Sequence, residues 1–276
     1  MGKRKLFCEL CPAAYRISLG KEIARRHLKN IFSRERFACR RETEPLPVVV
    51  STHSNGLIKR GPGISMALQE GKAENIRLAC SKINGIIVEP GETFSFWQLV
   101  GRTSRRNGFC EGRVIQNGKL IAGVGGGLCN LANSIHRLVL HSPLTVTEIH
   151  HHSDALAPDP ENGRVPYSAG TSVNYNFIDY RFRNDTTQAV QLLAWCDDYR
   201  LHAELRTTAE FPMSYRIVEE DHHFHLSSNG KYYRLSKIYR VTTEKASGCV
   251  LAKDLVWDNK SEVMFDPSLI PQDLIR

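Results

Sequence analysis

The stretch Gly123–Asn133 reads Gly-Val-Gly-Gly-Gly-Leu-Cys-Asn-Leu-Ala-Asn, and the fold around it follows from this pattern. Four glycines within five positions predict a tight loop, because glycine lacks a Cβ atom and adopts backbone angles that other residues avoid. Apolar residues then recur at helical spacing, at Leu128, Leu131, Ile135, Leu138 and Val139. We therefore expect a glycine loop that leads directly into a helix ending near His141.

Cys129 would lie in the first turn of this helix. The positive end of a helix dipole favours the thiolate form of a cysteine. The backbone N–H groups of the glycine loop would converge beside it and form an oxyanion site. The alternative is a tight turn before a core helix, with Cys129 as a small buried apolar residue.

A histidine triplet follows the helix, at the end of a strand predicted over residues 144–152. Alternation places His150 and His152 on one face of that strand, and an antiparallel return would bring them towards Cys129. This arrangement predicts a Cys–His nucleophilic pair whose base is oriented by a third group. The candidate orienting residues are Glu148, Asp154 and Asn133. A zinc site formed by Cys129, His150 and His152 is the alternative.

Composition and charge limit the classes of protein. The chain has 276 residues, of which 41% are hydrophobic, and this suits one large domain or one domain with extensions. Residues 1–41 hold 12 Lys/Arg against 3 Glu, a net charge of +9, whereas the whole chain carries +8. The remainder is close to neutral, so we expect no nucleic-acid partner.

The basic N-terminal segment predicts a helix over residues 15–36. Its apolar side chains Ala24, Leu28, Ile31 and Phe32 share one face, and such a helix can lie on an anionic membrane through residues 1–41. The alternative is a helix docked on the body of the protein. A zinc site is a further alternative for this segment, with Cys8, Cys11, His27 and Cys39 as its ligands.

The remaining patterns predict an α+β fold in which a central antiparallel sheet packs on helices. A helix is expected over 66–85, a hairpin over 114–121, and strands over 173–183 and 189–196. Three parts follow along the chain: a basic helical segment and linker over 1–47, a core domain over 48–210, and a β-rich extension over 211–276.

Several features are missing from the sequence. No phosphate-binding or dinucleotide-binding glycine motif occurs, so we expect no cofactor. Neither a signal-peptide pattern nor an apolar run of about 18 residues is present. The eight cysteines are scattered, which favours reduced thiols. We expect a cytoplasmic protein, peripheral at the inner membrane face if the basic helix binds lipid.

An ordered set of motifs resembles the VanW family, which is named for vancomycin B-type resistance clusters. The resemblance spans roughly residues 48–205. The motifs are Gly91-Glu-Thr-Phe-Ser-Phe-Trp97, Gly125-Gly-Gly-Leu-Cys129, His141-Ser-Pro-Leu-Thr-Val146, His152-Ser153 and Asp179-Tyr-Arg-Phe-Arg-Asn184. Two positions depart from the family's usual pattern: Asn130 replaces a frequent Gln, and Ile149 replaces a frequent Arg.

The resemblance implies a role in the bacterial cell wall, as a peptidoglycan L,D-transpeptidase that uses the motif cysteine. Cys129 would attack a carbonyl of a stem peptide or precursor, and His152 would take the thiol proton. The amides of Gly125, Gly126 and Gly127 would hold the oxyanion, with Asn130 and Ser153 beside the substrate. The alternative function is a non-catalytic accessory protein that binds a precursor or partner at the inner membrane face.

Overall fold

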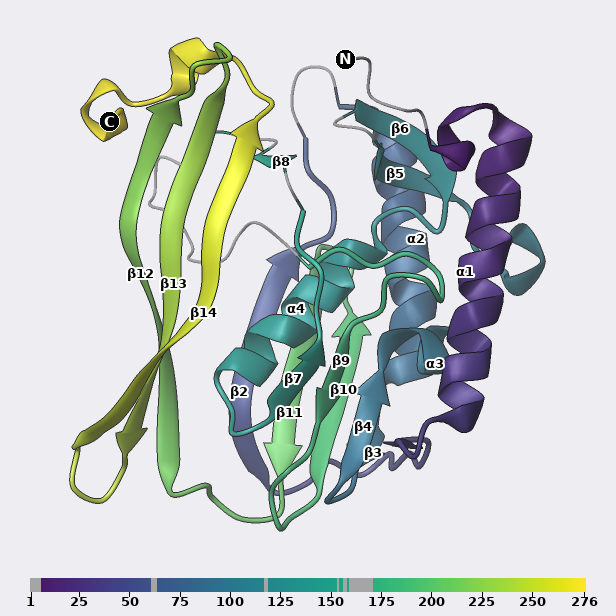
Figure 1. Ribbon diagram of the computed structural model, residues 1–276. Coiled ribbons are helices and arrows are strands. Elements are labelled where there is room, and N and C mark those ends of the chain that lie inside the picture. The colour runs from purple at the N-terminus through teal and green to yellow at the C-terminus, as the bar shows by residue number, and fades with distance from the viewer. Residues whose placement is uncertain (1–5, 61–63, 117–118, 153, 156–157, 159–170) are drawn as a thin grey trace.

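The computed structural model covers residues 1–276, and the structure describes residues 6–60, 64–116, 119–152, 154–155, 158 and 171–276. Figure 1 shows helices packed on small sheets, with a sheet of long strands at one side of the molecule and α1 at the other. The α-helices are α1 (Pro12–Phe32), α2 (Met66–Ile83), α3 (Phe96–Val100) and α4 (Leu128–Leu140). This mixture of helices and mainly antiparallel strands confirms the predicted α+β class.

The helix after the glycine loop packs on an antiparallel sheet of order β2-β11-β10-β3. Its strands are β2 (Val48–Gly56), β3 (Ile86–Val88), β10 (Val190–Cys196) and β11 (Arg200–Thr207). Leu131 and Ile135 of α4 are fully buried in the same core as Leu192 and Leu205 of the sheet, and α2 packs beside α4. The antiparallel sheet against this helix was predicted and is confirmed.

A second small sheet has the order β1-β4-β9-β7. Its strands are β1 (Arg36–Phe37), β4 (Glu92–Ser95), β7 (Thr145–Glu148) and β9 (Arg181–Arg183). Here the predicted strands were too long. The segment 173–180 turns at Asn176, whose φ of 42° lies in the left-handed region, and the Ile178 amide donates to the Asn174 carbonyl at 3.1 Å.

The N-terminal helix is docked on this second sheet by charged side chains. Arg26 donates to both carboxylate oxygens of Glu148 at 2.6 Å, and Arg181 donates to Asn30 and to Glu35. The docked-helix alternative is therefore confirmed. The zinc alternative is wrong, because no group of three metal-ligating side chains gathers in the described residues; the Cys11 sulfur instead caps α1 by accepting from the Ala14 amide.

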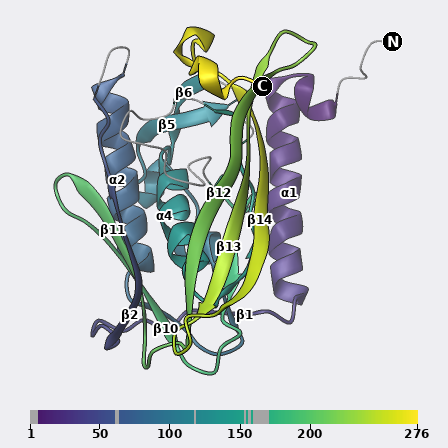
Figure 2. The ribbon, with the colours of Figure 1, turned by 90° about the vertical axis from the view of Figure 1, so that its left-hand side faces the viewer.

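The third sheet contains the predicted β-rich C-terminal extension. It consists of the long strands β12 (Met213–Leu226), β13 (Tyr232–Glu244) and β14 (Val250–Val263), with the short β8 (Asp154–Ala155) parallel to β14. Figure 2, in which this sheet faces the viewer, shows the three long strands running side by side. The Trp257 ring stacks on His151, so this sheet contacts the loop after β7.

The glycine loop is reached through a hairpin of β5 (Glu111–Gln116) and β6 (Lys119–Val124). Its register pairs Gln116 with Lys119, as an Asn-Gly turn predicts, although residues 117–118 themselves lie outside the described residues. In the described part of the chain, no helix is both long and apolar enough to cross a bilayer.

Candidate functional site

The glycine loop passes so close to its neighbours that side chains would not fit. Gly125 and Gly127 have φ angles of 79° and 101°, in the region that favours glycine, and Gly127 caps α4. A Cβ atom at Gly126 would collide with the backbone of Gly112, and one at Gly127 would collide with the side chain of Lys72. The local sequence thus fixes where α4 begins and places Cys129 in its first turn, as predicted.

Asn75 holds the loop from α2, a role that the sequence analysis missed. Its amide nitrogen donates to the carbonyls of Gly126 and Cys110, both at 3.0 Å, and its amide oxygen accepts from the Cys110 N–H at 2.9 Å. The Asn75 side chain is fully buried, so these bonds replace water. A polar residue on the apolar stripe of the predicted 66–85 helix was the available signal for this role.

The Cys129 thiol is held by the backbone of a segment far along the chain. It donates to the Val173 carbonyl at 3.7 Å, and it accepts from the Val173 N–H at 3.5 Å. Burial raises the pKa of this thiol, and the backbone hydrogen bonds offset only part of that effect. Burial thus opposes the effect expected from the helix dipole, and the raised pKa favours the thiol form of the resting residue.

Two backbone N–H groups of the glycine loop already donate hydrogen bonds within the protein. The Gly125 N–H donates to the Cys110 carbonyl at 3.0 Å, and the Gly126 N–H donates to the Gly123 carbonyl at 3.1 Å. Gly127 and Leu128 stand where the helix begins, and amides at that position have no acceptor inside the helix. Of the three glycine amides predicted to hold an oxyanion, only that of Gly127 lacks an acceptor among the described residues, and at the start of α4 the Leu128 N–H joins it, whereas the Asn130 N–H donates to the Gly127 carbonyl at 3.0 Å.

Asn130 is tied to the neighbouring sheet. Its side-chain oxygen accepts from the Asn55 amide on β2 at 2.6 Å, which leaves the Asn130 NH₂ group available as a donor. Asn130 and Cys129 are adjacent and half-buried on α4. The predicted substrate-binding residue Ser153 lies outside the described residues.

His150 meets one of its predicted orienting residues. Its Nε2 atom lies 3.3 Å from Glu148 Oε1, but Glu148 is already bound by Arg26 and by the Asp179 N–H. The pKa of Glu148 is lowered, since the Arg26 and Asp179 bonds outweigh the opposing effect of burial. This carboxylate therefore serves mainly to dock α1.

His152 is half-buried, and burial lowers its pKa while the Asp154 carboxylate opposes the shift. Of the candidate orienting residues, Asp154 is the one whose negative charge acts on His152. The lowered pKa favours the neutral form of His152, which is the form that a general base requires.

The segment 171–173 lies between the histidines and the cysteine. Its Ser172 N–H donates to the His150 carbonyl at 2.7 Å, and the next residue, Val173, bonds the Cys129 thiol. Among the described residues, no hydrogen bond or ion pair joins Cys129 to His150 or His152. His150 and Cys129 thus contact neighbouring residues of one backbone segment. It gathers no metal-binding group from them in the described part of the chain, so the second zinc alternative is also wrong.

His151 belongs to an aromatic cluster that the sequence analysis did not find. Its ring stacks on Trp257 with centroids 4.0 Å apart, and it lies edge-on to His136 with centroids 6.4 Å apart. His136 is buried and its Nδ1 atom lies 3.1 Å from the Tyr180 hydroxyl. Burial is the main cause that lowers the pKa of His136 to about 3 and that of His151 to about 4.

These two histidines predict a loss of stability in acid. Their pKa values in the folded protein lie below the ordinary 6.5, so the unfolded chain binds protons first as the pH falls. We expect the free energy of unfolding to decrease from about pH 6.5 towards about pH 4, measured by urea unfolding. His151→Gln should reduce the slope of this dependence but not abolish it, because His136 remains, and an unfolding free energy of the wild type that stays constant over the range would contradict the prediction.

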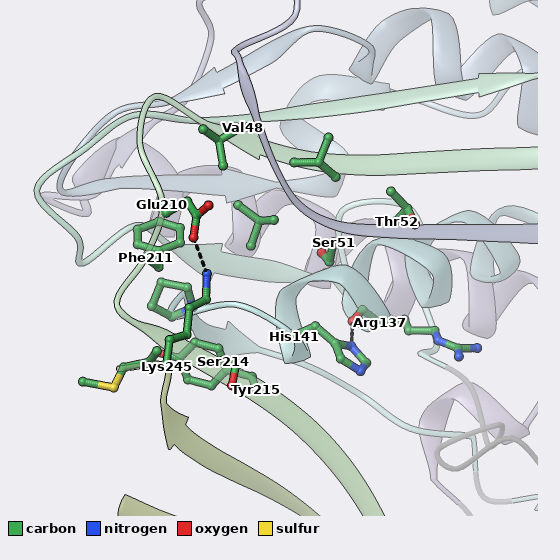
Figure 3. A pocket seen from close by; sticks show the side chains of 14 residues that line it. Val48, Ser51, Thr52, Arg137, His141, Glu210, Phe211, Ser214, Tyr215 and Lys245 are labelled. Atoms are coloured by element: carbon green, nitrogen blue, oxygen red, sulfur yellow. Dashed lines mark hydrogen bonds and ion pairs between the residues drawn. The ribbon is translucent and has the colours of Figure 1, made fainter. Parts of the chain in front are cut away.

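A separate cavity of about 430 Å³ lies at the other end of α4. Figure 3 shows Arg137 and His141, at the end of this helix, beside β2 and the start of β12, and Lys245 bonded to Glu210. Because α4 rises by about 1.5 Å per residue, Arg137 at the edge of this cavity is about 12 Å from Cys129 along the helix axis. The cavity is not part of the cysteine site.

The part of the chain that contains this site is similar to known proteins. Residues 71–206 match the family model described as VanW like protein, and this range includes Asn75, the glycine loop, Cys129 and the histidine triplet. No solved structure shows a significant match.

Two relatives show the extent of the similarity. The chain is 28% identical to the vancomycin B-type resistance protein VanW of Enterococcus faecalis over 220 residues, which cover 80% of this chain and 79% of that protein. It is 30% identical to the uncharacterized protein YoaR of Bacillus subtilis over 123 residues, which cover 45% of this chain and 39% of that protein. The motifs around Cys129, the family match and the similarity along most of the chain agree, and residues 71–206 form a VanW-like domain.

Proposed function

We propose that this protein acts in the response to glycopeptide antibiotics, as a cysteine-dependent acyl transferase of the L,D-transpeptidase type. Its substrate would be a peptidoglycan stem peptide or precursor. The observation that supports this proposal most strongly is the placement of Cys129 in the first turn of α4, directly after the glycine loop. The name of the Enterococcus relative supports the link to vancomycin resistance.

The chemistry divides into two steps. The Cys129 sulfur attacks a peptide carbonyl carbon, its proton passes to His152, and the leaving amine takes that proton as the C–N bond breaks. A thioester on Cys129 results. An acceptor amine then attacks the thioester, and the sulfur leaves and regains a proton. Since the resting group is a thiol bonded to Val173, attack requires these bonds to be released and a base to act.

A direct test is to trap the thioester. The full chain would be incubated with a synthetic stem peptide and no acceptor, and intact-mass spectrometry would detect a gain equal to the acyl fragment. A hydroxylamine-labile adduct on Cys129 is the expected result. Absence of an adduct, together with absence of amine exchange, would support the non-catalytic accessory protein instead.

A second proposal concerns α1, for which the structure gives a specific observation. One face of this docked helix stays in solvent although it is apolar: Leu28, Ile31 and Phe32 are 55%, 72% and 80% exposed. Lys21 and Arg25 lie exposed on the same face, at helical spacing from Leu28. An apolar stripe flanked by cations matches the surface of an anionic bilayer.

We expect the full chain to bind anionic vesicles and to lose most of this binding in the double variant Ile31→Ser, Phe32→Ser. Vesicle sedimentation would measure it, and raising the salt concentration should weaken it. The matched control is Val250→Ser, Leu251→Ser, which removes two adjacent apolar side chains from β14 that are also more than half exposed. Equal binding by both double variants would contradict a membrane role for α1.

A further inference from the structure

We propose that Lys72, Arg113 and Lys59 form a site beside the glycine loop for a carboxylate group of the peptide substrate. This inference rests on the proposed function and gives the chemical class of group that the site recognises. None of the three residues belongs to the motifs that suggested the cysteine chemistry. They come from α2, from β5 and from the segment that follows β2.

The position of Lys72 ties the site to the reactive cysteine. Lys72 is only 7% exposed, and its stem packs so closely on Gly127 that a Cβ atom there would meet its Cγ and Cδ atoms. Gly127 caps α4, and Cys129 follows two residues later. A group bound by Lys72 would therefore lie next to the loop that presents the thiol.

The charge of Lys72 is not neutralised within the described part of the chain. No hydrogen bond or ion pair reaches Lys72 from any described residue, and its charged neighbours are Lys59 and Arg113. Burial, and then these two like charges, lower its pKa to about 8. A buried cation is costly unless it is paired, so three cations without a described carboxylate partner are complementary to an anion from outside the chain.

The chemistry of the three groups favours a carboxylate on a peptide. A guanidinium donates two parallel N–H groups to a carboxylate, whereas an ammonium adds a single charged contact. Arg113 is half-buried, which limits competition from water. The anionic groups of a stem peptide are its carboxylates, so binding one of them here would fix which neighbouring carbonyl is presented to Cys129.

The test measures binding without chemistry, in the full chain carrying Cys129→Ala. A synthetic stem peptide with free carboxylates and the same peptide with its carboxylates converted to amides would be titrated calorimetrically. We expect the carboxylate form to bind about tenfold more tightly or better, as the loss of a charge-assisted hydrogen bond implies. Lys72→Met, which keeps the stem against Gly127, should remove most of that difference, and Arg113→Gln should reduce it.

The matched control is Arg77→Met, because Arg77 lies on the same helix but pairs with Glu74 at the surface. This variant should keep the preference for the carboxylate form. Equal affinity for both peptides, no binding of either, an unchanged preference in Lys72→Met and Arg113→Gln, or equally tight binding of inorganic phosphate would overturn the proposal. Because the assay lacks the Cys129 sulfur, carboxylate binding can succeed or fail independently of thioester formation.

Discussion

Cys129→Ala is expected to abolish acyl transfer while leaving the protein folded. Removing a covalent nucleophile lowers turnover by several orders of magnitude, on the order of 10⁴-fold or more. The side chain is half-buried and its bonds to Val173 are weak sulfur contacts, so the loss of stability should stay below about 1.5 kcal/mol. Turnover of the stem peptide and a thermal melt would together separate loss of chemistry from loss of fold.

Cys129→Ser sharpens this test. Sulfur and oxygen are nearly isosteric, but a hydroxyl stays protonated near neutral pH, so this variant should also be inactive. The controls are Cys196→Ala and Cys249→Ala, since neither cysteine follows a glycine loop at a helix start. Normal glycopeptide tolerance from a folded Cys129→Ala protein would contradict the enzyme and leave the accessory protein as the better description.

Substitutions of His151 and His152 are expected to have different effects. His152→Ala should be inactive, because His152 is the proposed base and burial favours its neutral form. His151→Ala should have a mild effect on activity, because alternation places His151 on the opposite strand face from His152, but it should lower stability, since His151 stacks on Trp257. If His151→Ala lost activity and His152→Ala kept it, the assignment of the base would be wrong.

The local sequence pattern was sufficient to predict the elements that depend on residues close together in the chain. The glycine loop, the helix from Leu128 and the β-rich C-terminal extension follow from glycine spacing, helical periodicity and alternation, and all three are confirmed. The strand predicted over 173–183 failed because alternation continues through a turn at Asn176 that is fixed by backbone hydrogen bonds. Periodicity alone does not detect a residue with a left-handed backbone.

The candidate site depends more strongly on contacts between residues that are distant in sequence. Sequence spacing indicated the cysteine and the histidine triplet, but it could not show that Val173 would occupy the thiol or that His151 would face Trp257. It also missed Asn75 and Lys72, because their roles depend on contacts between α2 and the glycine loop. Burial by parts of the chain that are distant in sequence raises the pKa of Cys129, and a dipole argument limited to one helix does not include this effect.

The second large effect is expected at Arg181, within the motif Asp179–Asn184. Arg181 is 3% exposed, and its Nε atom donates to the fully buried Asp179 at 2.8 Å while its other nitrogens reach Glu35 and Asn30. Asp179 in turn accepts from Ser95 and from the Trp97 N–H. This one guanidinium therefore balances a buried carboxylate and fastens α1 to the core.

Arg181→Met keeps the apolar stem but leaves Asp179 buried without its cation, which costs about 3–5 kcal/mol. Arg183→Met is the matched control, because Arg183 lies on the same strand and pairs with Asp185 at the same spacing, but in solvent. An exposed pair contributes about 0–1 kcal/mol, so the control should unfold near the wild-type urea midpoint. If the two variants lost similar stability, burial would not explain the contribution of the Arg181–Asp179 pair to the free energy of unfolding. A much larger loss in Arg181→Met than in Arg183→Met would identify the motif Asp179–Asn184 as structural support for the α1 interface.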